Sequence, residues 1–350
     1  MTFLDSMATI PEILETMVGA RAARMAGVAG AIRDKGIRRV VIIGSGSSFN
    51  SALMAQPLFD QLGIAVQLHY PNQFAVHATT IDRQALHVVI SQGGATRSVF
   101  DAVQKLHRHG CPVCSLTANT ESPIAQAADV PVSMGCGEEH YLYRTVGVCS
   151  TVVSCWQLAM TLALENGMIT HEDAASLDRE MLASAWALPQ VREMALAWYE
   201  RHRFSLMRAQ YLMFAGANDL WAVAREADIK VMEMVPLVTR GFELEEIIHG
   251  PQNAFDASGA YIVFARRGPD AQKASAIAAF LGERIGFCAL VGNVGVGRRD
   301  FCFEETGERL SALEYLTFAQ VMAYRLSADR GRDLTRKLNA GLADYISKEL

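Results

Sequence analysis

Short runs of apolar, often β-branched residues alternate with longer amphipathic stretches along this chain. Residues 39–43 and 87–90 are such runs in the first half, and residues 211–215 and 261–264 are such runs in the second half. A strand that is buried on both faces of a parallel sheet shows this continuous apolar pattern. We therefore expect an α/β protein, in which mostly parallel sheets are flanked by helices.

The stretches after these runs carry helical signals. Residues 49–62 follow the first run, and residues 221–235 form a second long stretch that stops at Pro236, since proline cannot continue a helix. Shorter apolar runs fall near residues 113–116, 130–133 and 287–291. The alternation of strands and helices indicates parallel β-α-β units.

The order of signals repeats in the two halves of the chain. Each half shows an apolar run, a turn, a helical stretch and further strands, and a charged helical connector at residues 171–203 separates them. A length of 350 residues also exceeds that of an ordinary single-core domain. We expect two domains, at residues 1–190 and 191–350.

Composition limits the partners and the cellular location that we expect. The formal net charge is −5 with no basic block, which argues against a nucleic-acid or anionic membrane partner. Residues 145–164 carry no charged side chain but contain several hydroxyl groups, and we expect a buried helix there, not a membrane span. With no secretory signal and seven scattered cysteines, the expected location is the cytoplasm.

Two turns rich in serine and glycine carry the clearest candidate chemistry. Residues 44–48 and 91–96 each follow a buried strand and open a helix. Backbone N–H groups and the positive end of the helix dipole then face an anion. The hydroxyls of Ser47, Ser48, Ser91 and Thr96 are candidate donors to a phosphate. The alternative is that these residues merely cap their helices.

These turns resemble those of a known family. Gly-Ser-Gly-Ser-Ser-Phe-Asn-Ser-Ala at 44–52 is similar to the first phosphosugar loop of the sugar isomerase (SIS) domain, and Ser-Gln-Gly-Gly-Ala-Thr at 91–96 is similar to its Ser-Gln-Ser-Gly-Glu-Thr loop. The resemblance adds Gly46, Gln92 and Gly93 to the phosphate-binding set. Gly93 and Ala95 depart from the family's serine and glutamate, so only the backbone N–H of Gly93 remains as a contact there.

The second half resembles the isomerase part of glucosamine-6-phosphate synthase and the fructosamine-6-phosphate deglycases. The segment from Lys230 to Glu233 matches the family's Lys-x-x-Glu motif, and the segment from Glu246 to Pro251 matches Glu-x-x-His-Gly-Pro. The resemblance implies that Glu233, His249 and Lys230 are catalytic. It also implies a homodimer in which His249 reaches the site of the partner subunit.

The expected roles follow from sugar chemistry. One carboxylate that takes a proton from one carbon and returns it to the next suits Glu233. An imidazole that titrates near neutral pH suits ring opening, which we assign to His249. Lys230 lies on the same helical face as Glu233 and would stabilise negative charge on an enediolate. The alternative is that Lys230 and Glu233 form a solvated ion pair and that His249 caps a turn.

At other positions the sequence matches the family's motifs less exactly. The family's tail lysine corresponds to Arg336, with Lys337 beside it, and its Ala-Ser-Thr-Lys loop corresponds to residues 142–146, which lack a lysine. The resemblance therefore implies an altered sugar pocket, with Glu139, Arg144 and Thr145 among its walls. Cys111 and Cys114 have redox spacing but fall on an apolar run, so we expect them to pack.

The function expected from these motifs is that of an aldose-ketose isomerase or a fructosamine-6-phosphate deglycase. It would act on a sugar phosphate or an amino-sugar phosphate, without glutaminase activity. The alternative is a sensor that binds a sugar phosphate without catalysis. We expect no metal, since no set of Cys, His and acidic residues has ligand spacing, and no cofactor. The sequence leaves open which sugar and which amine conjugate is used.

Overall fold

The computed structural model describes residues 2–139, 141–307 and 309–350. The chain divides into two compact units. The first unit comprises Glu12–Leu182 with Arg336–Leu350, and the second comprises Ala183–Thr335 with Met1–Pro11. The sequence placed a boundary after residue 190 and assigned each end of the chain to the nearer domain. In the structure, the N-terminal segment instead belongs to the unit of Ala183–Thr335, and the C-terminal segment belongs to the unit of Glu12–Leu182.

The sheet of the first unit is parallel throughout, with the strand order β2-β1-β3-β4-β5. Its strands are β1 (Arg39–Gly44), β2 (Ala65–His69), β3 (Leu86–Ile90), β4 (Val113–Thr117) and β5 (Val130–Ser133). The chain leaves β1 toward one edge and returns to β3 on the other side of β1. Ligands of open α/β sheets bind at such a reversal, beyond the carboxyl ends of the strands.

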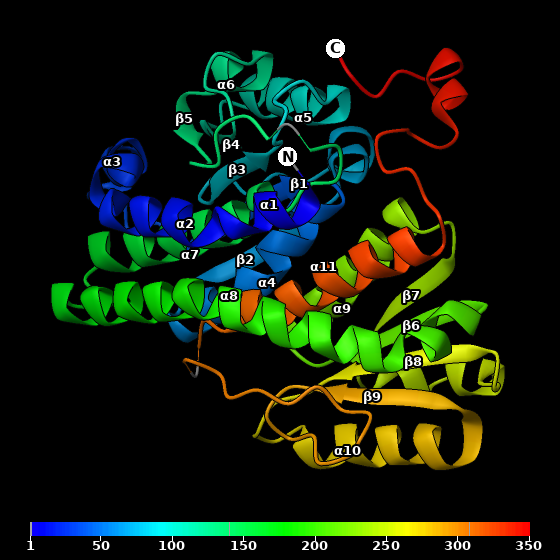
Figure 1. The fold of residues 1–350 in the computed structure, drawn as a ribbon. Coiled ribbons are helices and arrows are strands. Elements are labelled where there is room, and N and C mark those ends of the chain that lie inside the picture. The colour runs from blue at the N-terminus through cyan, green and yellow to red at the C-terminus, as the bar shows by residue number, and fades with distance from the viewer. Residues whose placement is uncertain (1, 140, 308) are drawn as a thin grey trace. The chain divides into compact units, whose positions relative to one another are not determined.

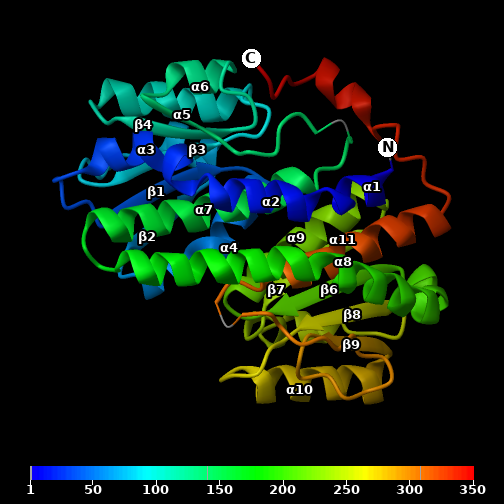
Figure 2. The same ribbon diagram turned by 60° about the vertical axis from the view of Figure 1, so that its left-hand side comes forward.

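Helices cover both faces of this sheet (Figures 1 and 2). The helices α5 and α6 lie on one face, and α4 and α7 lie on the other. The helical elements of the first unit are α3 (Arg21–Ile32), α4 (Ser47–Gln61), the π-helix η1 (Gln73–His77), α5 (Arg97–Arg108), α6 (Pro123–Ala127), α7 (Val146–Glu165) and the 3-10 helix η5 (Ala340–Asp344). Two further helices, α2 (Ile10–Gly19) and α8 (His171–Arg208), continue from one unit into the other.

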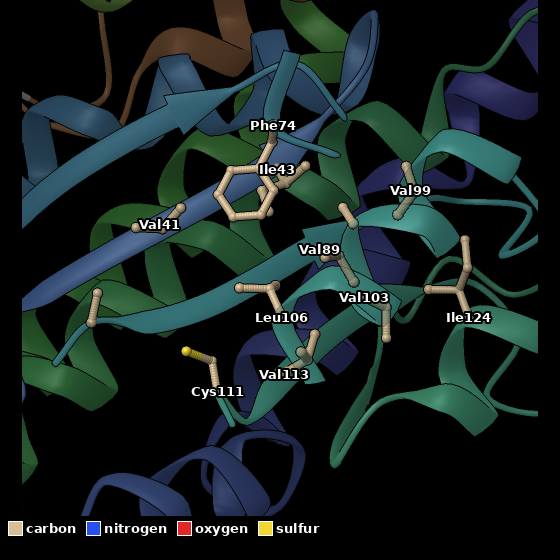
Figure 3. Close-up of a cluster of buried hydrophobic side chains, with 12 residues drawn as sticks. Val41, Ile43, Phe74, Val89, Val99, Val103, Leu106, Cys111, Val113 and Ile124 are labelled. Atoms are coloured by element: carbon tan, nitrogen blue, oxygen red, sulfur yellow. The ribbon is translucent and has the colours of Figure 1, made fainter. Parts of the chain in front are cut away.

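Alternate strand residues build the core beneath α5. Val41 and Ile43 of β1 and Val89 of β3 form one cluster with Val103 and Leu106 of α5 (Figure 3). Burial of these side chains stabilises the edge from which the two serine-containing turns project. α5 is the helix that residues 91–96 were expected to open.

The apolar helix α7 passes the length and composition test for a membrane span. Every residue of the tested window is buried inside the protein. The helix packs against α3 and α4 of its own unit. Burial on all sides accounts for an apolar pattern all round the helix.

The sheet of the second unit is also parallel, with the order β7-β6-β8-β9. Its strands are β6 (Tyr211–Gly216), β7 (Val238–Glu243), β8 (Gly259–Phe264) and β9 (Phe287–Val291). Its helical elements are α1 (Phe3–Ala8), α9 (Asp219–Met234), the 3-10 helices η2 (Glu246–Ile248) and η3 (Pro251–Ala254), α10 (Ala271–Phe280), the π-helix η4 (Leu281–Ile285) and α11 (Ala312–Asp329). The direction of the crossover reverses between β6 and β8, as it does between β1 and β3.

The expected fold class is confirmed: helices flank two mostly parallel sheets. The sequence missed β2 and β7, which are the strands at one edge of each sheet. Both are partly exposed and carry polar side chains, so neither shows a continuous apolar run. The helices α4 and α9 each begin two residues before the expected start. This difference makes Ser47 and Asp219 the first residues of their helices.

Candidate active site

The two serine-containing turns of the first unit lie on neighbouring strands. β1 pairs directly with β3, and both turns follow the carboxyl ends of these strands. They therefore flank the point where the crossover direction reverses. The structure brings the turns together at the position where sheets of this order bind ligands.

The first turn opens α4 through a backbone conformation that favours glycine. Gly46 precedes the helix with φ 55° and ψ −127°, and no atom lies within 4 Å of where its Cβ would be. Residues with a Cβ rarely adopt a positive φ. Ser47 and Ser48 follow at the start of the 15-residue helix, and both side chains are partly exposed. The first turn thus presents hydroxyl groups at a helix N-terminus.

The second turn brings its two hydroxyl groups into direct contact. Ser91 Oγ lies 3.0 Å from Thr96 Oγ1, although five residues separate them. Thr96 is the N-cap of α5, yet its side chain makes no capping hydrogen bond. The interpretation that these residues serve only as caps therefore does not describe Thr96.

Close packing fixes the shape of the second turn. Gly94 has φ 65°, and a Cβ on it would meet Ser122 Oγ at 2.0 Å. The Ser91 backbone N–H donates to Leu116 O at 3.1 Å. A side chain at Gly94 would displace the turn, whereas Gly93 has open space where its Cβ would be. The departure from the family's serine at 93 therefore leaves the backbone N–H accessible.

Gln92 joins the second turn to the N-terminus of α7. Its Nε2 donates to Glu139 Oε2 at 3.1 Å, and Glu139 in turn accepts hydrogen bonds from the backbone N–H groups of Thr145, Val146 and Gly147 at 2.6 to 3.1 Å. A carboxylate at the N-terminus of a helix is favoured by the helix dipole. Glu139 thus already supplies the anion at this helix end.

Gly147 makes this arrangement possible. A Cβ at position 147 would lie 2.2 Å from Gln92 Nε2 and Oε1. The sequence analysis did not identify Gly147, because the reason for a glycine there is a side chain 55 positions earlier in the chain. Thr145 is fully buried and its hydroxyl donates to Glu139 Oε1 at 3.1 Å. Arg144 donates through Nη1 to the backbone oxygen of Glu139.

The C-terminal segment contacts the second turn of its own unit. The Arg97 backbone N–H donates to Lys348 O at 3.0 Å, and the Leu350 backbone N–H donates to Ala95 O at 2.9 Å. Thr96 and Glu349 form an antiparallel bridge. Arg336 and Lys337 belong to the same segment, and both are exposed.

Lys230 and Glu233 of the second unit lie on α9 and form an ion pair. Lys230 Nζ lies 3.1 Å from Glu233 Oε2 and 3.9 Å from Glu226 Oε1. The Lys230 side chain is 1% exposed and that of Glu233 is 43% exposed. The alternative of a solvated ion pair therefore does not describe Lys230. Glu226 is a fully buried acid that the sequence analysis did not identify, although its i,i+4 spacing from Lys230 could have indicated it.

His249 follows η2 and lies at the surface of the second unit. Its side chain is 60% exposed, and its Nε2 lies 3.1 Å from Glu245 Oε1. Glu245 also accepts from Lys273, and that bond, followed by the one to His249, lowers the pKa of Glu245. His249 and Glu246 line a cavity of about 480 Å³ together with Arg225 and Arg240. The acids Asp228 and Glu243 line the same cavity, so its wall carries charges of both signs.

The pair Cys111 and Cys114 is buried next to and within β4. Burial raises the pKa of Cys114 to about 12 and also raises the pKa of Cys111. A thiol that stays protonated is a poor nucleophile. Their environment is that of packed core residues.

Comparison with known proteins agrees with this architecture. Residues 32–164 match the family model described as the SIS domain. A glutamine–fructose-6-phosphate aminotransferase (isomerizing) of Symbiobacterium thermophilum is 25% identical over 327 residues, which cover 90% of this chain and 52% of that protein. The chain thus spans about half the length of this relative.

Solved structures share the fold over nearly the whole chain. One is a protein of Clostridium difficile 630 proposed to be a phosphosugar isomerase, with a TM-score of 0.91, 22% identity and coverage of 100% of this chain and 99% of that one. Another is the C-terminal domain of glucosamine-fructose-6-phosphate aminotransferase from Francisella tularensis, with a TM-score of 0.86, 14% identity and coverage of 95% and 96%. The resemblance stated from the two turns is therefore confirmed: the chain contains an SIS domain at residues 32–164 and has the two-sheet fold of these phosphosugar proteins.

Proposed function

We propose that this chain is an enzyme that binds a sugar phosphate at the β1/β3 edge of the first unit and transfers a proton on the open-chain sugar. The observation that carries the proposal is the placement of the Ser47 and Ser91–Thr96 turns on adjacent strands at the point where the crossover reverses. The relatives named above act on, or are proposed to act on, sugar phosphates.

The phosphate would be held by donors alone. The hydroxyls of Ser47, Ser91 and Thr96, with the backbone N–H groups at the start of α4, face no acidic side chain within their own turns. Each hydrogen bond to a charged oxygen contributes about 1.5 to 3 kcal/mol. The 3.0 Å contact between Ser91 Oγ and Thr96 Oγ1 would place both on one phosphate oxygen or on two adjacent oxygens.

Glu233 is the proposed base. Lys230 Nζ holds its Oε2 at 3.1 Å, which leaves Oε1 to take the proton from one sugar carbon. Return of the proton to the neighbouring carbon gives the isomer. If the substrate carries an amine at the first carbon, cleavage of the carbon–nitrogen bond and addition of water release the amine instead.

The direct test is Glu233→Gln, which keeps the shape of the side chain and removes the base. We expect exchange of a C1 proton of fructose 6-phosphate with deuterated solvent, followed by NMR, to fall about a thousandfold. Binding of the sugar phosphate should stay within threefold, because Glu233 does not contact the phosphate turns in this proposal. Glu283→Gln changes an exposed glutamate of the same unit and serves as the control with full activity.

The same assay separates the two reactions and the sensor alternative. Exchange of the C1 proton of fructose 6-phosphate with no cleavage of fructosamine 6-phosphate identifies an isomerase, and cleavage identifies a deglycase. Wild-type protein that binds these compounds but catalyses neither reaction is a sensor, and the proposed enzymatic function would then be wrong.

We also propose that the enzyme is a homodimer in which His249 completes the site of the partner subunit. The 60% exposure of His249 and its pairing with Glu245 support this role, since the imidazole is available at the surface. Complementation tests it. Equal amounts of the inactive Glu233→Gln and His249→Ala variants, unfolded and refolded together, should recover about a quarter of wild-type activity. Half of the dimers are then mixed, and each mixed dimer has one intact site. If His249 acts within its own chain, no activity returns.

A further inference from the structure

A cavity lies at the reversal point of the sheet in the second unit. The turns after β6 and β8 border it, and these strands are neighbours. Its volume is about 120 Å³. The lining combines an apolar wall with charged residues, which include Leu244, Phe264, Asp219, Arg266, Arg267 and Asp270. The position is the one at which sheets of this order hold ligands.

The turn at this cavity repeats the backbone of the phosphate turn. Asn218 precedes the 16-residue helix α9 with φ 58° and ψ −127°, and Gly46 precedes α4 with φ 55° and ψ −127°. The next residue is Asp219 in the second unit and Ser47 in the first. A carboxylate therefore occupies the position that a serine occupies beside the proposed phosphate.

Asp219 is buried, and one of its two carboxylate oxygens accepts a side-chain hydrogen bond. Its side chain is 5% exposed, and its Oδ2 accepts from Arg266 Nη2 at 2.9 Å. Its Oδ1 is buried and accepts a hydrogen bond from no residue that the structure describes. A buried acceptor without a donor is costly, so the cavity has a vacant hydrogen-bonding position on a carboxylate.

The charge around Asp219 selects against an anion. Arg266 also pairs with Glu305 at 3.1 Å. The wall itself holds two acids and two arginines, and Arg267 is paired in addition with Glu304 outside the wall. A positively charged donor would satisfy Oδ1.

We propose that this cavity is a second ligand site, separate from the phosphosugar site, and that it binds a small protonated amine. The ammonium group donates to Asp219 Oδ1, and a short carbon body packs against Leu244 and Phe264. A cavity of this order holds a molecule of about four to six non-hydrogen atoms. The apolar wall and the single vacant acceptor favour an organic amine over a bare metal ion, which takes several oxygen ligands.

Isothermal titration calorimetry with three probes of matched size tests the charge preference. Ethanolamine carries an ammonium, ethylene glycol is neutral and glycolate is an anion. We expect ethanolamine to bind the full-length protein with a Kd at least tenfold below those of the other two, both with and without saturating fructose 6-phosphate. Equal binding of ethylene glycol, stronger binding of glycolate or no binding of ethanolamine would overturn the proposal.

Two variants locate the binding. Asp219→Asn removes the charge while keeping the shape, and Ala217→Leu fills the cavity from a partly exposed position of its wall. Each should weaken ethanolamine at least tenfold, and fructose 6-phosphate binding should not change in either. Thermal melting checks that both variants fold. Should Ala217→Leu fold and bind ethanolamine like the wild type, the amine does not occupy this cavity and the proposal is wrong.

Discussion

The turn after β1 and the turn after β6 lead into their helices through the same backbone conformation. Their first helical residues differ, since one is a neutral hydroxyl donor and the other is an acid. Gly46 and Asn218 share their backbone angles, and both turns lie where the crossover of a parallel sheet reverses. The first turn continues with Ser47 and Ser48, whereas the second continues with Asp219, which pairs with Arg266. We propose that each turn forms part of a ligand site and that the first helical residue determines which charge the site accepts.

The comparison also separates what the fold requires from what the ligand requires. Gly44 and Gly216 end their strands in the same way, so the close approach of strand and helix belongs to the fold. The hydroxyls of Ser91 and Thr96 have no counterpart in the second unit, where Arg266 and Arg267 follow β8. The proposed donors to phosphate therefore belong to the first unit.

The largest expected effect comes from giving the first turn the residue of the second. Ser47→Asp places a carboxylate beside the proposed phosphate. At about 4 Å and an effective dielectric constant near 20, this repulsion amounts to roughly 4 kcal/mol, or about a thousandfold in Kd. Calorimetry with fructose 6-phosphate measures it, and Ser47→Asn is the uncharged control of the same size. A Kd for Ser47→Asp within threefold of that for Ser47→Asn would contradict the assignment of the first turn.

The next effect concerns Glu314, a buried acid of the second unit. Glu314 on α11 is fully buried, and burial raises its pKa from 4.5 to about 7. The folded protein then binds a proton between these values that the unfolded chain has lost, so the free energy of unfolding falls as the pH rises from 4.5 to 7. The fall from this group is at most about 3 kcal/mol.

The variant Glu314→Gln isolates this contribution. Urea unfolding of the wild type and the variant at several pH values between 4.5 and 8 gives the difference between them. That difference should change through this range in favour of the variant and become constant above pH 7. A difference independent of pH would mean that Glu314 titrates at its ordinary value.

The smallest effect sharpens the role of Gln92 in the first unit. Gly147→Ala puts a methyl group where Gln92 Nε2 and Oε1 lie, at 2.2 Å, and should cost about 1 kcal/mol of stability or more. Gln92 connects the second turn to Glu139 by a hydrogen bond. Displacing Gln92 should therefore weaken phosphosugar binding about tenfold. Gly30→Ala, at an exposed position of α3 with open space at its Cβ, is the matched control. Equal Kd values for the two variants would remove Gln92 from the binding account.

The sequence predicted the parts of the fold that follow from local pattern. The buried strands β1, β3, β6 and β8 were recognisable as apolar runs. The edge strands β2 and β7 were not, because an exposed strand with polar side chains has the pattern of a loop. The exchange of the chain ends between the units was beyond prediction, since it depends on contacts between residues far apart in sequence.

The candidate site was predictable to the extent that it lies in short motifs. The two turns and the Lys230 to Glu233 segment were found as motifs, and the structure adds the Ser91–Thr96 contact and the burial of Lys230. Gly147 and Glu226 act through neighbours that only the folded chain supplies. The cavity at Asp219 was missed for the same reason: one aspartate at a helix start is ordinary until its second oxygen is found without a donor.

The most direct test of the difference between the two turns is a crystal structure of the protein grown with fructose 6-phosphate. We expect the phosphate oxygens within hydrogen-bonding distance of the hydroxyls of Ser47, Ser91 and Thr96, and no phosphate beside Asp219. A phosphate bound next to Asp219, or a sugar phosphate bound away from the β1/β3 edge, would contradict the account.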